Sequence, residues 1–509
     1  MAITISRRAP RSVPLLLSLL LPAPAGAVDW LVVPSLRLRE SYTDNAVLAP
    51  QAQARSDFIT EIAPALALIG SGPRLQVHLD YSWRKFHYLH RPDTDTHQLQ
   101  ASTEAELVKD WLHVEARAGV SRQNVSPFGP QIIDGLPGSG NESTVRTTML
   151  SPYLRHRFRA LGTAELRYTR STVASGGDLL AMHSDEVQML LSGEPHGNGW
   201  SWNASYDRRN TQNSKLAPER MERSSVGLRY PFSSKWAATA SAGTEKEGYA
   251  SSTGKAPQGR FWSVGGVWTP SPRTSVAFST GRRFFGQTYS LDAHFLQRHT
   301  NWSLNYSENI TTMPAQYLRL GNADAANLLD QLWRGIFPNA MQRRLRIDAF
   351  LRYANGLGPE LGAINYFSNR YFLQKQLSLT AARATAKSTV IVAVNAVDRT
   401  AQTASGIDSG LLPGVEFGSE DRTRQVGSNV GWSWQASSRT SVNVNAGYAS
   451  VRSLSAPRRD NNVTVTAGLS RTLQPKMTAS IDLRRTQHSS TRGGGYRENG
   501  VSATLNMQF

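Results

Sequence analysis

The sequence predicts an all-β fold, a transmembrane antiparallel β-barrel of about 22 strands, within a range of about 18 to 24. Three observations predict this fold. Apolar residues recur at every second position in many successive segments, which gives each strand one apolar and one polar face. Short and long connections alternate between these segments, as in membrane barrels. The last segment, residues 501–509, alternates strictly and ends on the aromatic residue Phe509.

The amino-terminal residues have the organisation of a secretory signal peptide. Arginines precede an apolar run at residues 15–21, and Ala25-Gly26-Ala27 forms a small-x-small cleavage site. We therefore expect residues 1–27 to be a signal peptide that is cleaved during export. Residues 28–509 then form a single domain, the barrel.

Composition narrows the range of functions. The chain contains no Cys, which excludes cysteine-based metal sites and thiol catalysis. No segment approaches the roughly 18 consecutive apolar residues that a membrane helix needs. The net charge of +18 would suit nucleic acid, but no recognition motif accompanies it. Export also separates the chain from nucleic acid, so we expect no nucleic-acid partner.

Alternation places each strand in order along the chain. Within residues 75–83, Leu, Val, Leu, Tyr and Trp alternate with Gln, His, Asp and Ser. Within residues 442–448, Val, Val, Ala and Tyr alternate with Asn, Asn and Gly. The predicted strands span residues 31–42, 57–69, 73–89, 97–109, 111–123, 144–158, 162–173, 184–193, 199–210, 221–231, 235–247, 259–269, 274–284, 288–297, 300–312, 365–385, 388–400, 420–435, 440–452, 461–472, 476–488 and 497–509.

The connections predict which side of the membrane each strand end faces, because outer-membrane barrels have short periplasmic turns and longer external loops. Two short connections share a Trp-to-Val pattern, at residues 268–276 and 434–442, which indicates repeated hairpins with Trp at the membrane interface. Short connections fall near residues 70–72, 110, 159–161, 231–234, 270–273, 435–439 and 473–475. Long connections fall near residues 43–56, 124–143, 211–220, 313–364 and 401–419.

One segment of the longest connection follows helical spacing instead. Residues 322–337, within the long loop at 314–363, predict a short helix with an apolar stripe. The helix either folds into the lumen as a constriction or packs over the external rim, and the need to bury its stripe favours the lumen. The candidate constriction residues are Leu328, Leu332, Trp333 and Phe337.

The final strand resembles the closing strand of bacterial outer-membrane β-barrels, whose terminal Phe is read by the barrel-assembly machinery. The resemblance implies that Phe509 is an assembly signal and that the protein resides in a Gram-negative outer membrane. We expect this strand to pair with residues 31–42 and to turn its odd-numbered residues, from Val501 to Phe509, toward lipid.

Several short sequence motifs together resemble those of an uncharacterised family associated with the PEP-CTERM/exosortase protein-sorting system. This family is found with exopolysaccharide loci, so the resemblance implies a role in polymer export or envelope assembly. It brings no catalytic residues with it. The motifs recur in order across nearly all of the mature chain, at residues 34–45, 56–61, 126–130, 151–158, 261–264, 282–286 and 302–312.

No constellation of residues predicts catalysis, a cofactor or a metal. The acidic residues and His at 93–97 could ligate a metal but read more simply as a solvated loop. A Ser/His/Asn hydrolase site in the barrel wall stays open, although no Ser lies in a nucleophile elbow. We therefore expect no enzyme activity and no cofactor.

Arginines on the polar faces give the strongest indication of cargo. Positive walls concentrate anions, and Arg can hold a carboxylate with two hydrogen bonds, so the lumen could favour an acidic polysaccharide. The alternative is that Glu115, Glu165, Asp80 and Asp482 neutralise the arginines across strands. The candidate lumen-facing residues are Arg37, Arg39, Arg74, Arg117, Arg155, Arg157, Arg167, Arg229 and Arg484.

Three functions are compatible with these observations. The first is a porin-like channel that serves exopolysaccharide export, with the 322–337 helix as its constriction. The second is a structural or docking barrel with a plugged lumen. The third, a hydrolase in the barrel wall, has the least support. The expected partners are outer-membrane lipid, the barrel-assembly machinery and an anionic exopolysaccharide.

Overall fold

The computed structural model gives the protein as a single chain of strands. It describes residues 28–131, 140–158, 162–176, 181–193, 199–213, 216–252, 254, 257–318, 329–330, 333–334, 343, 347, 366–404, 408 and 421–509. The predicted signal peptide, residues 1–27, lies outside the described residues.

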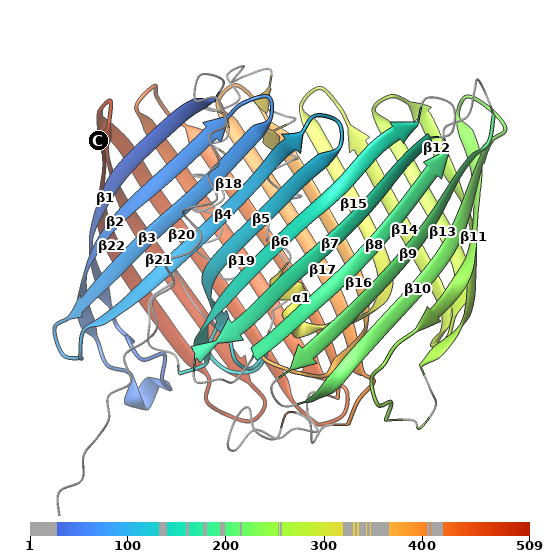
Figure 1. The fold of residues 1–509 in the computed structure, drawn as a ribbon. Coiled ribbons are helices and arrows are strands. Elements are labelled where there is room, and N and C mark those ends of the chain that lie inside the picture. Colours follow the sequence, from blue (N-terminus) through green and yellow to red (C-terminus); the bar gives the residue numbers. More distant parts are fainter. Residues whose placement is uncertain are drawn as a thin grey trace, which may run out of the picture.

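One antiparallel sheet of 22 strands closes into a barrel, which confirms the predicted fold class (Figure 1). Each strand pairs with its successor, and closure comes from pairing of β1 with β22, where Ser35 faces Gln508 and Thr43 faces Gly500. The strands are β1 Asp29–Thr43, β2 Asp57–Ser71, β3 Leu75–Tyr88, β4 Thr94–Val108, β5 Leu112–Asn124, β6 Glu142–Phe158, β7 Gly162–Ser175, β8 Ala181–Gly193, β9 Ser201–Asn213, β10 Leu216–Pro231, β11 Trp236–Lys246, β12 Gln258–Ser271, β13 Thr274–Arg283, β14 Gly286–Leu296, β15 Thr300–Thr312, β16 Tyr371–Ala384, β17 Ser388–Ala401, β18 Arg422–Gln435, β19 Thr440–Ser453, β20 Arg459–Gln474, β21 Met477–Ser490 and β22 Tyr496–Gln508.

The outer face of the barrel is apolar. Ile481 and Leu483 on β21 are 58% and 59% exposed, whereas the intervening positions of the same strand turn polar side chains inward. Val501 on β22 is exposed and Ser502 is buried, as the terminal alternation predicts. A closed sheet with exposed apolar side chains on every second residue can contact the hydrocarbon of a lipid bilayer. The barrel is therefore of the membrane-spanning, outer-membrane type.

The two rims differ. The short turns lie together at the upper rim of Figure 1, where the carboxyl terminus also lies, and the longer connections leave from the lower rim. We call these the short-turn rim and the long-loop rim. At the short-turn rim, Trp236 stacks on Trp268 and Trp432 on Trp434, and all four rings are exposed. Such rings form the aromatic girdle at the headgroup level.

Two predicted boundaries are wrong. Residues 211–220 are not a long loop, because β9 continues to Asn213 and β10 begins at Leu216. Polar side chains there suggested a loop, but strands that continue beyond the lipid no longer need an apolar face. Residues 366–370 are not the start of the strand predicted at 365–385, because β16 begins at Tyr371. These residues lie inside the barrel instead.

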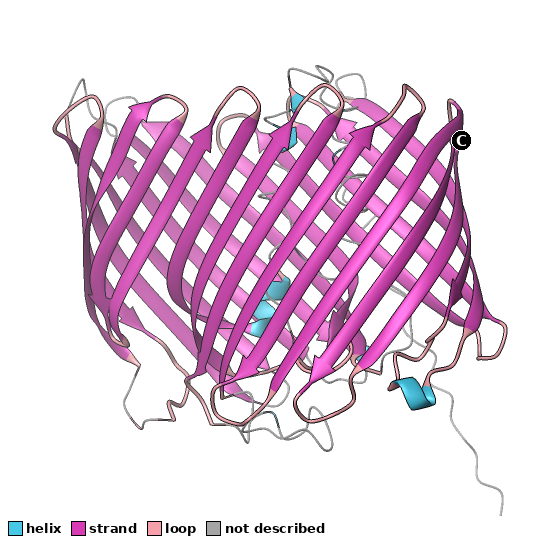
Figure 2. Cartoon of the chain, turned by 180° about the vertical axis from the view of Figure 1, so that it is seen from behind, coloured by secondary structure: helices cyan, strands magenta, loops and turns pink. Residues whose placement is uncertain are grey.

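Two short helical elements are described over their full length. The 3-10 turn η1, Gln51–Gln53, lies in the connection between β1 and β2. The helix α1, Met313–Tyr317, follows β15 directly, and Figure 2 shows it enclosed by the strands of the barrel. The Thr312 side chain accepts a hydrogen bond from the Ala315 backbone N–H and caps the helix. Among the described residues, no helix has the length and apolar character to cross a membrane.

Candidate functional site

The candidate site is the inner face of the barrel together with the loop segments that fold against it. Strand alternation places polar side chains on this face, and the closed sheet fixes each of them relative to its neighbours on the adjacent strands. Ion pairs within strands and between strands line much of the wall. Three loop segments fold inward in the half of the barrel nearest the long-loop rim.

A deeply buried ion pair lies on β1 to β3. Glu61 is 1% exposed and accepts hydrogen bonds from Nε and Nη2 of Arg84, at 2.7 and 2.9 Å. Arg39 and Arg37 on β1 lie 3.9 and 4.0 Å from the same carboxylate. Three guanidinium groups therefore share one carboxylate.

A second ion pair lies at the closure of the barrel. Arg484 donates from Nη2 and Nε to the two oxygens of Glu498, at 2.7 and 3.1 Å. The Thr43 hydroxyl on β1 donates to the same carboxylate at 2.7 Å. Arg39 also donates to Ser502 at 3.1 Å. Side chains therefore bridge the first and last strands across the closing seam.

A third group lies on β5 to β7. Arg167 contacts Glu115 at 3.1 Å and Glu165 at 3.0 Å, and its guanidinium lies over the ring of Tyr153. Arg155 reaches Glu165 at 3.4 Å. Glu115 and Glu165 thus neutralise arginines across strands, as the alternative interpretation of the sequence proposed.

The structure places the predicted arginines as follows. Arg74 lies in the turn before β3, outside the strand predicted to carry it, and reaches Glu106 at 4.0 Å. Arg117 pairs with Glu115, and Arg157 lies on the inward parity of β6. Arg229 is exposed on the inner parity of β10. Asp80 contacts His78 at 2.7 Å, and Asp482 accepts a hydrogen bond from Ser480 at 3.0 Å. The candidate arginines with a carboxylate partner are Arg37, Arg39, Arg74, Arg117, Arg155, Arg167 and Arg484.

The wall from β9 to β14 has a different character. Serine hydroxyls bond in pairs between neighbouring strands, each at 2.7 Å: Ser205 with Ser225, Ser241 with Ser263, and Ser279 with Ser290. Gly and Ala occupy much of the same inward face. Around these serine pairs the side chains are short, so this patch of the wall projects little into the lumen.

A charged cluster lies between these serine pairs and the long-loop rim. Glu245 on β11 accepts from Nη2 of Arg283 on β13 at 2.7 Å. Glu247 follows two residues later, just beyond the end of β11. Burial raises the pKa of Glu247 to about 7, although the charge of Arg283 opposes the shift.

The segment 366–370 links opposite walls of the lumen. Phe367 donates its backbone N–H to the carbonyl of Val125 at 3.0 Å. Its ring packs among Val125, Val145, Val173 and Met182, which belong to β6, β7, β8 and the loop after β5. Four residues later the chain enters β16, on the other side of the barrel. The segment thus crosses between walls that are far apart around the sheet.

A second loop holds this segment in place. Asp408 accepts from the Ser368 hydroxyl at 2.6 Å and from the Asn369 backbone N–H at 2.8 Å. Burial raises the pKa of Asp408, while these two hydrogen bonds oppose the shift. The side chain of Asn369 also bonds that of Asn213 on β9, at 2.6 Å. The connection between β17 and β18 therefore braces the crossing segment.

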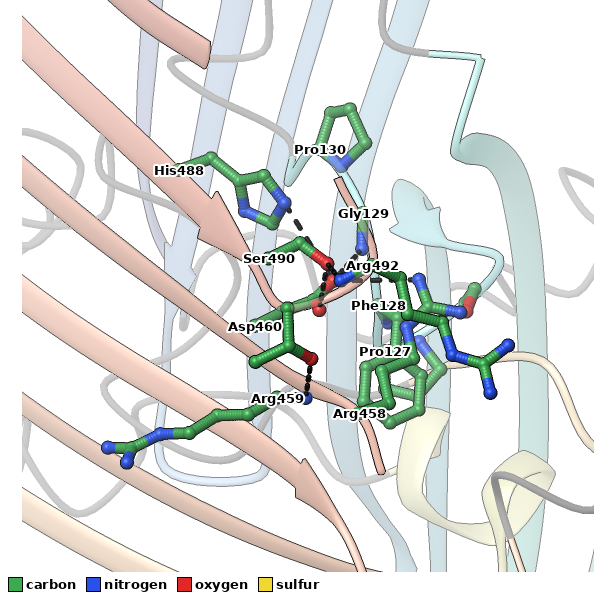
Figure 3. Close-up of polar contacts among 12 residues, drawn as sticks. Pro127, Phe128, Gly129, Pro130, Arg458, Arg459, Asp460, His488, Ser490 and Arg492 are labelled. Atoms are coloured by element: carbon green, nitrogen blue, oxygen red, sulfur yellow. Dashed lines mark hydrogen bonds and ion pairs between the residues drawn. The ribbon is translucent and has the colours of Figure 1, made fainter. Parts of the chain in front are cut away.

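A third loop folds inward and contacts β20 and β21 (Figure 3). The Gly129 backbone N–H donates to Asp460 at 2.9 Å, and Ser490 donates to the other oxygen at 2.7 Å. Arg458 lies over the ring of Phe128, at 4.4 Å from its centroid. Gly129 has a φ of +94°, a conformation that favours glycine. This loop contains the Ser126 to Pro130 motif that the sequence singled out.

The predicted constriction helix is described only in part. Leu328, Leu332 and Phe337 lie outside the described residues. Trp333 is described, is helical and is buried, and Leu329 beside it is fully buried. Asp330 accepts from Arg343 at 2.6 Å, and despite burial, hydrogen bonds from Arg343 and Arg334 lower the pKa of Asp330.

No protein-family model matches the chain, and no curated protein matches it. Solved outer-membrane barrels do. The FrpB iron transporter from Neisseria meningitidis aligns at 8% identity with a TM-score of 0.49, over 94% of this chain and 82% of that one. The siderophore receptor PirA from Pseudomonas aeruginosa aligns at 9% identity with a TM-score of 0.45, over 94% of this chain and 80% of that one. OpdK from the same organism aligns at 8% identity with a TM-score of 0.34, over 94% of this chain and 99% of that one. The likeness concerns the barrel alone.

Sequence reasoning missed the residues that organise the loops. Phe367 and Asn369 fall in the segment predicted as the start of a strand, and Asp408 lies in a connection where no period of two or of 3.6 marks its role. Gly129 carried a weak signal, because a glycine between two prolines at 127 and 130 predicts a fixed turn. Among the described residues, no group of three or more His, Asp or Glu side chains is placed to hold a metal ion.

Proposed function

We propose that the protein is a porin-like channel of the Gram-negative outer membrane, whose long-loop half is narrowed by inward-folded loops. The observation that carries this proposal is the crossing segment at 366–370, anchored by Phe367 on one side and by Asp408 on the other. A loop braced inside a hydrophilic barrel of 22 strands is the arrangement of a selective passage, because a barrel of this size otherwise encloses a wide lumen.

We place the route along the wall from β9 to β14. Paired serines there offer hydroxyl groups without bulk, and the crossing segment packs mainly against β6–β8, with Asn369 bonded to Asn213 at the end of β9. Hydroxyl and amide groups suit an uncharged or weakly charged sugar polymer. Because most candidate arginines are paired with carboxylates, we no longer favour strong selectivity for anions.

The proposed cargo is an exopolysaccharide, exported within a PEP-CTERM/exosortase system. Support comes from the sequence resemblance and from the hydroxyl-rich wall. The proposal includes export by the cleaved signal peptide and insertion by the barrel-assembly machinery through Phe509. It involves no catalytic step.

A plugged docking barrel is the second candidate. The interlocking of three loops favours it, since Gly129 bonds Asp460 and Asp408 bonds Asn369 within one lumen. In this case the loops would be a permanent seal, and the external loop surfaces would bind partners.

Planar-bilayer recording separates these candidates. Thr312 and Tyr371 face each other in the sheet, so a short Gly-Asn turn can replace residues 313–370 without disturbing the barrel. A channel predicts measurable conductance in the intact protein and a severalfold increase in the variant. Silence of the intact protein together with conductance of the variant would instead support the plugged barrel. Heat-modifiable gel mobility verifies folding in both proteins.

The cargo needs a separate measurement. A deletion strain should accumulate polymer in the periplasm, and the intact gene should restore export. Normal export without the protein would overturn the proposed cargo while leaving the channel intact.

A further inference from the structure

The outer face of β18 to β22 carries a basic cluster. It lies next to the apolar band, on the side of the long-loop rim. Each member shares its strand parity with lipid-facing side chains: on β20 with Val463 and Leu469, and on β22 with Val501. All members are exposed and lie toward the long-loop rim. The outer basic cluster consists of Arg422, Arg424, Arg452, Arg459, Arg485 and Arg497.

The register brings these arginines side by side. Arg452 stands opposite Arg424 on one flank and opposite Arg459 on the other. Like charges directly opposite each other on neighbouring strands destabilise a sheet. Arg424 is offset by Asp398, so the facing pair Arg452 and Arg459 calls for an anion that binds between them.

No carboxylate of residues 421–509, all of which are described, supplies this anion from the same face. Asp460 and Glu498 have the opposite parity and bond inside the barrel. Asp398 on β17 reaches Arg424 alone, at 2.7 Å. The Tyr448 hydroxyl and Ser450 contact Arg459 and orient it without adding charge.

We propose that the outer basic cluster binds phosphate groups on the headgroups of lipids in the adjoining leaflet. The cluster begins where the apolar band ends, which is the level of lipid headgroups. Arginine presents a planar set of donors that fits phosphate with two hydrogen bonds. The apolar side chains below would hold the acyl chains of the same lipid. This surface is independent of any passage through the lumen.

The test uses the refolded full chain in neutral detergent and diphosphorylated lipid A as the probe. Binding is read as the rise in the temperature at which the folded, fast-migrating band disappears. Arg452, Arg485 and Arg497 are replaced by Ser together. The matched control replaces Arg383, Arg439 and Arg471 at the short-turn rim by Ser, which removes the same charge.

We expect the cluster variant to bind the lipid roughly 100-fold more weakly, because each basic residue contributes about 1 kcal/mol near an anionic surface. The control variant should bind as the unmodified protein does. Lipid A without phosphates and inorganic phosphate should each leave the transition unchanged. Equal losses in both variants, or equal stabilisation by the dephosphorylated lipid, would overturn the proposal. Stabilisation by inorganic phosphate alone would identify an ion site and overturn the assignment to lipid.

Discussion

Replacement of Glu61 by Gln tests the buried charge balance of the lumen. The change keeps the size of the side chain and leaves Arg84, Arg39 and Arg37 without their shared carboxylate. Breaking a buried ion pair from one side costs about 3–5 kcal/mol, because the remaining charge stays desolvated. Glu61 is 1% exposed and the side chain of Arg84 is 12% exposed, so we expect a loss of unfolding free energy of about 3 kcal/mol or more.

A graded control comes from the same cluster. Arg37 lies 4.0 Å from Glu61 and its side chain is 42% exposed, so Arg37→Gln should cost no more than about 1 kcal/mol. Urea unfolding from detergent micelles measures both losses. In bilayers, Glu61→Gln should also raise the preference for chloride over potassium, because the lumen gains net positive charge. Equal losses in the two variants, or a Glu61→Gln protein as stable as the original, would refute the reasoning.

Three further predictions concern the lumen. As pH falls from about 8 to about 6, Glu247 should take up a proton, because burial raises its pKa to about 7. The ion selectivity of the channel should then shift toward anions. Glu247→Gln should abolish this shift in reversal-potential measurements, and a shift that persists in the variant would contradict the prediction. Phe367→Ser should free the crossing segment, since it removes the ring from its apolar cluster, and single-channel conductance should increase; unchanged conductance would show that the segment does not narrow the lumen. Ser263→Trp should slow solute entry into proteoliposomes severalfold, whereas Val264→Trp on the lipid face should not; equal rates would exclude a route along β12.

The barrel itself could be predicted from the sequence because lipid imposes a period of two on every strand that it contacts. Val501 and Ser502 illustrate this, since one faces outward and the other inward as the alternation requires. The prediction failed where that constraint ends. β9 and β10 continue past the lipid with polar side chains on both faces, so residues 211–220 resembled a loop.

The interior of the barrel could be predicted only in part. Strand parity placed Arg39, Arg167 and Arg484 on the inner face, but parity does not give the register that sets Glu61, Glu165 and Glu498 beside them. The loop contacts join residues far apart in the sequence, such as Phe367 with Val125, and no local pattern encodes them.

Crosslinking tests the crossing segment most directly. The natural chain has no Cys, so Val125→Cys and Phe367→Cys together introduce a single pair, at positions joined by a backbone hydrogen bond of 3.0 Å. The folded barrel should form this disulfide in high yield under mild oxidant, seen as altered mobility of the unfolded chain. The pair Ala49→Cys with Phe367→Cys should not form one. Absence of the 125–367 crosslink, with both thiols reactive toward maleimide, would contradict a segment that crosses the lumen.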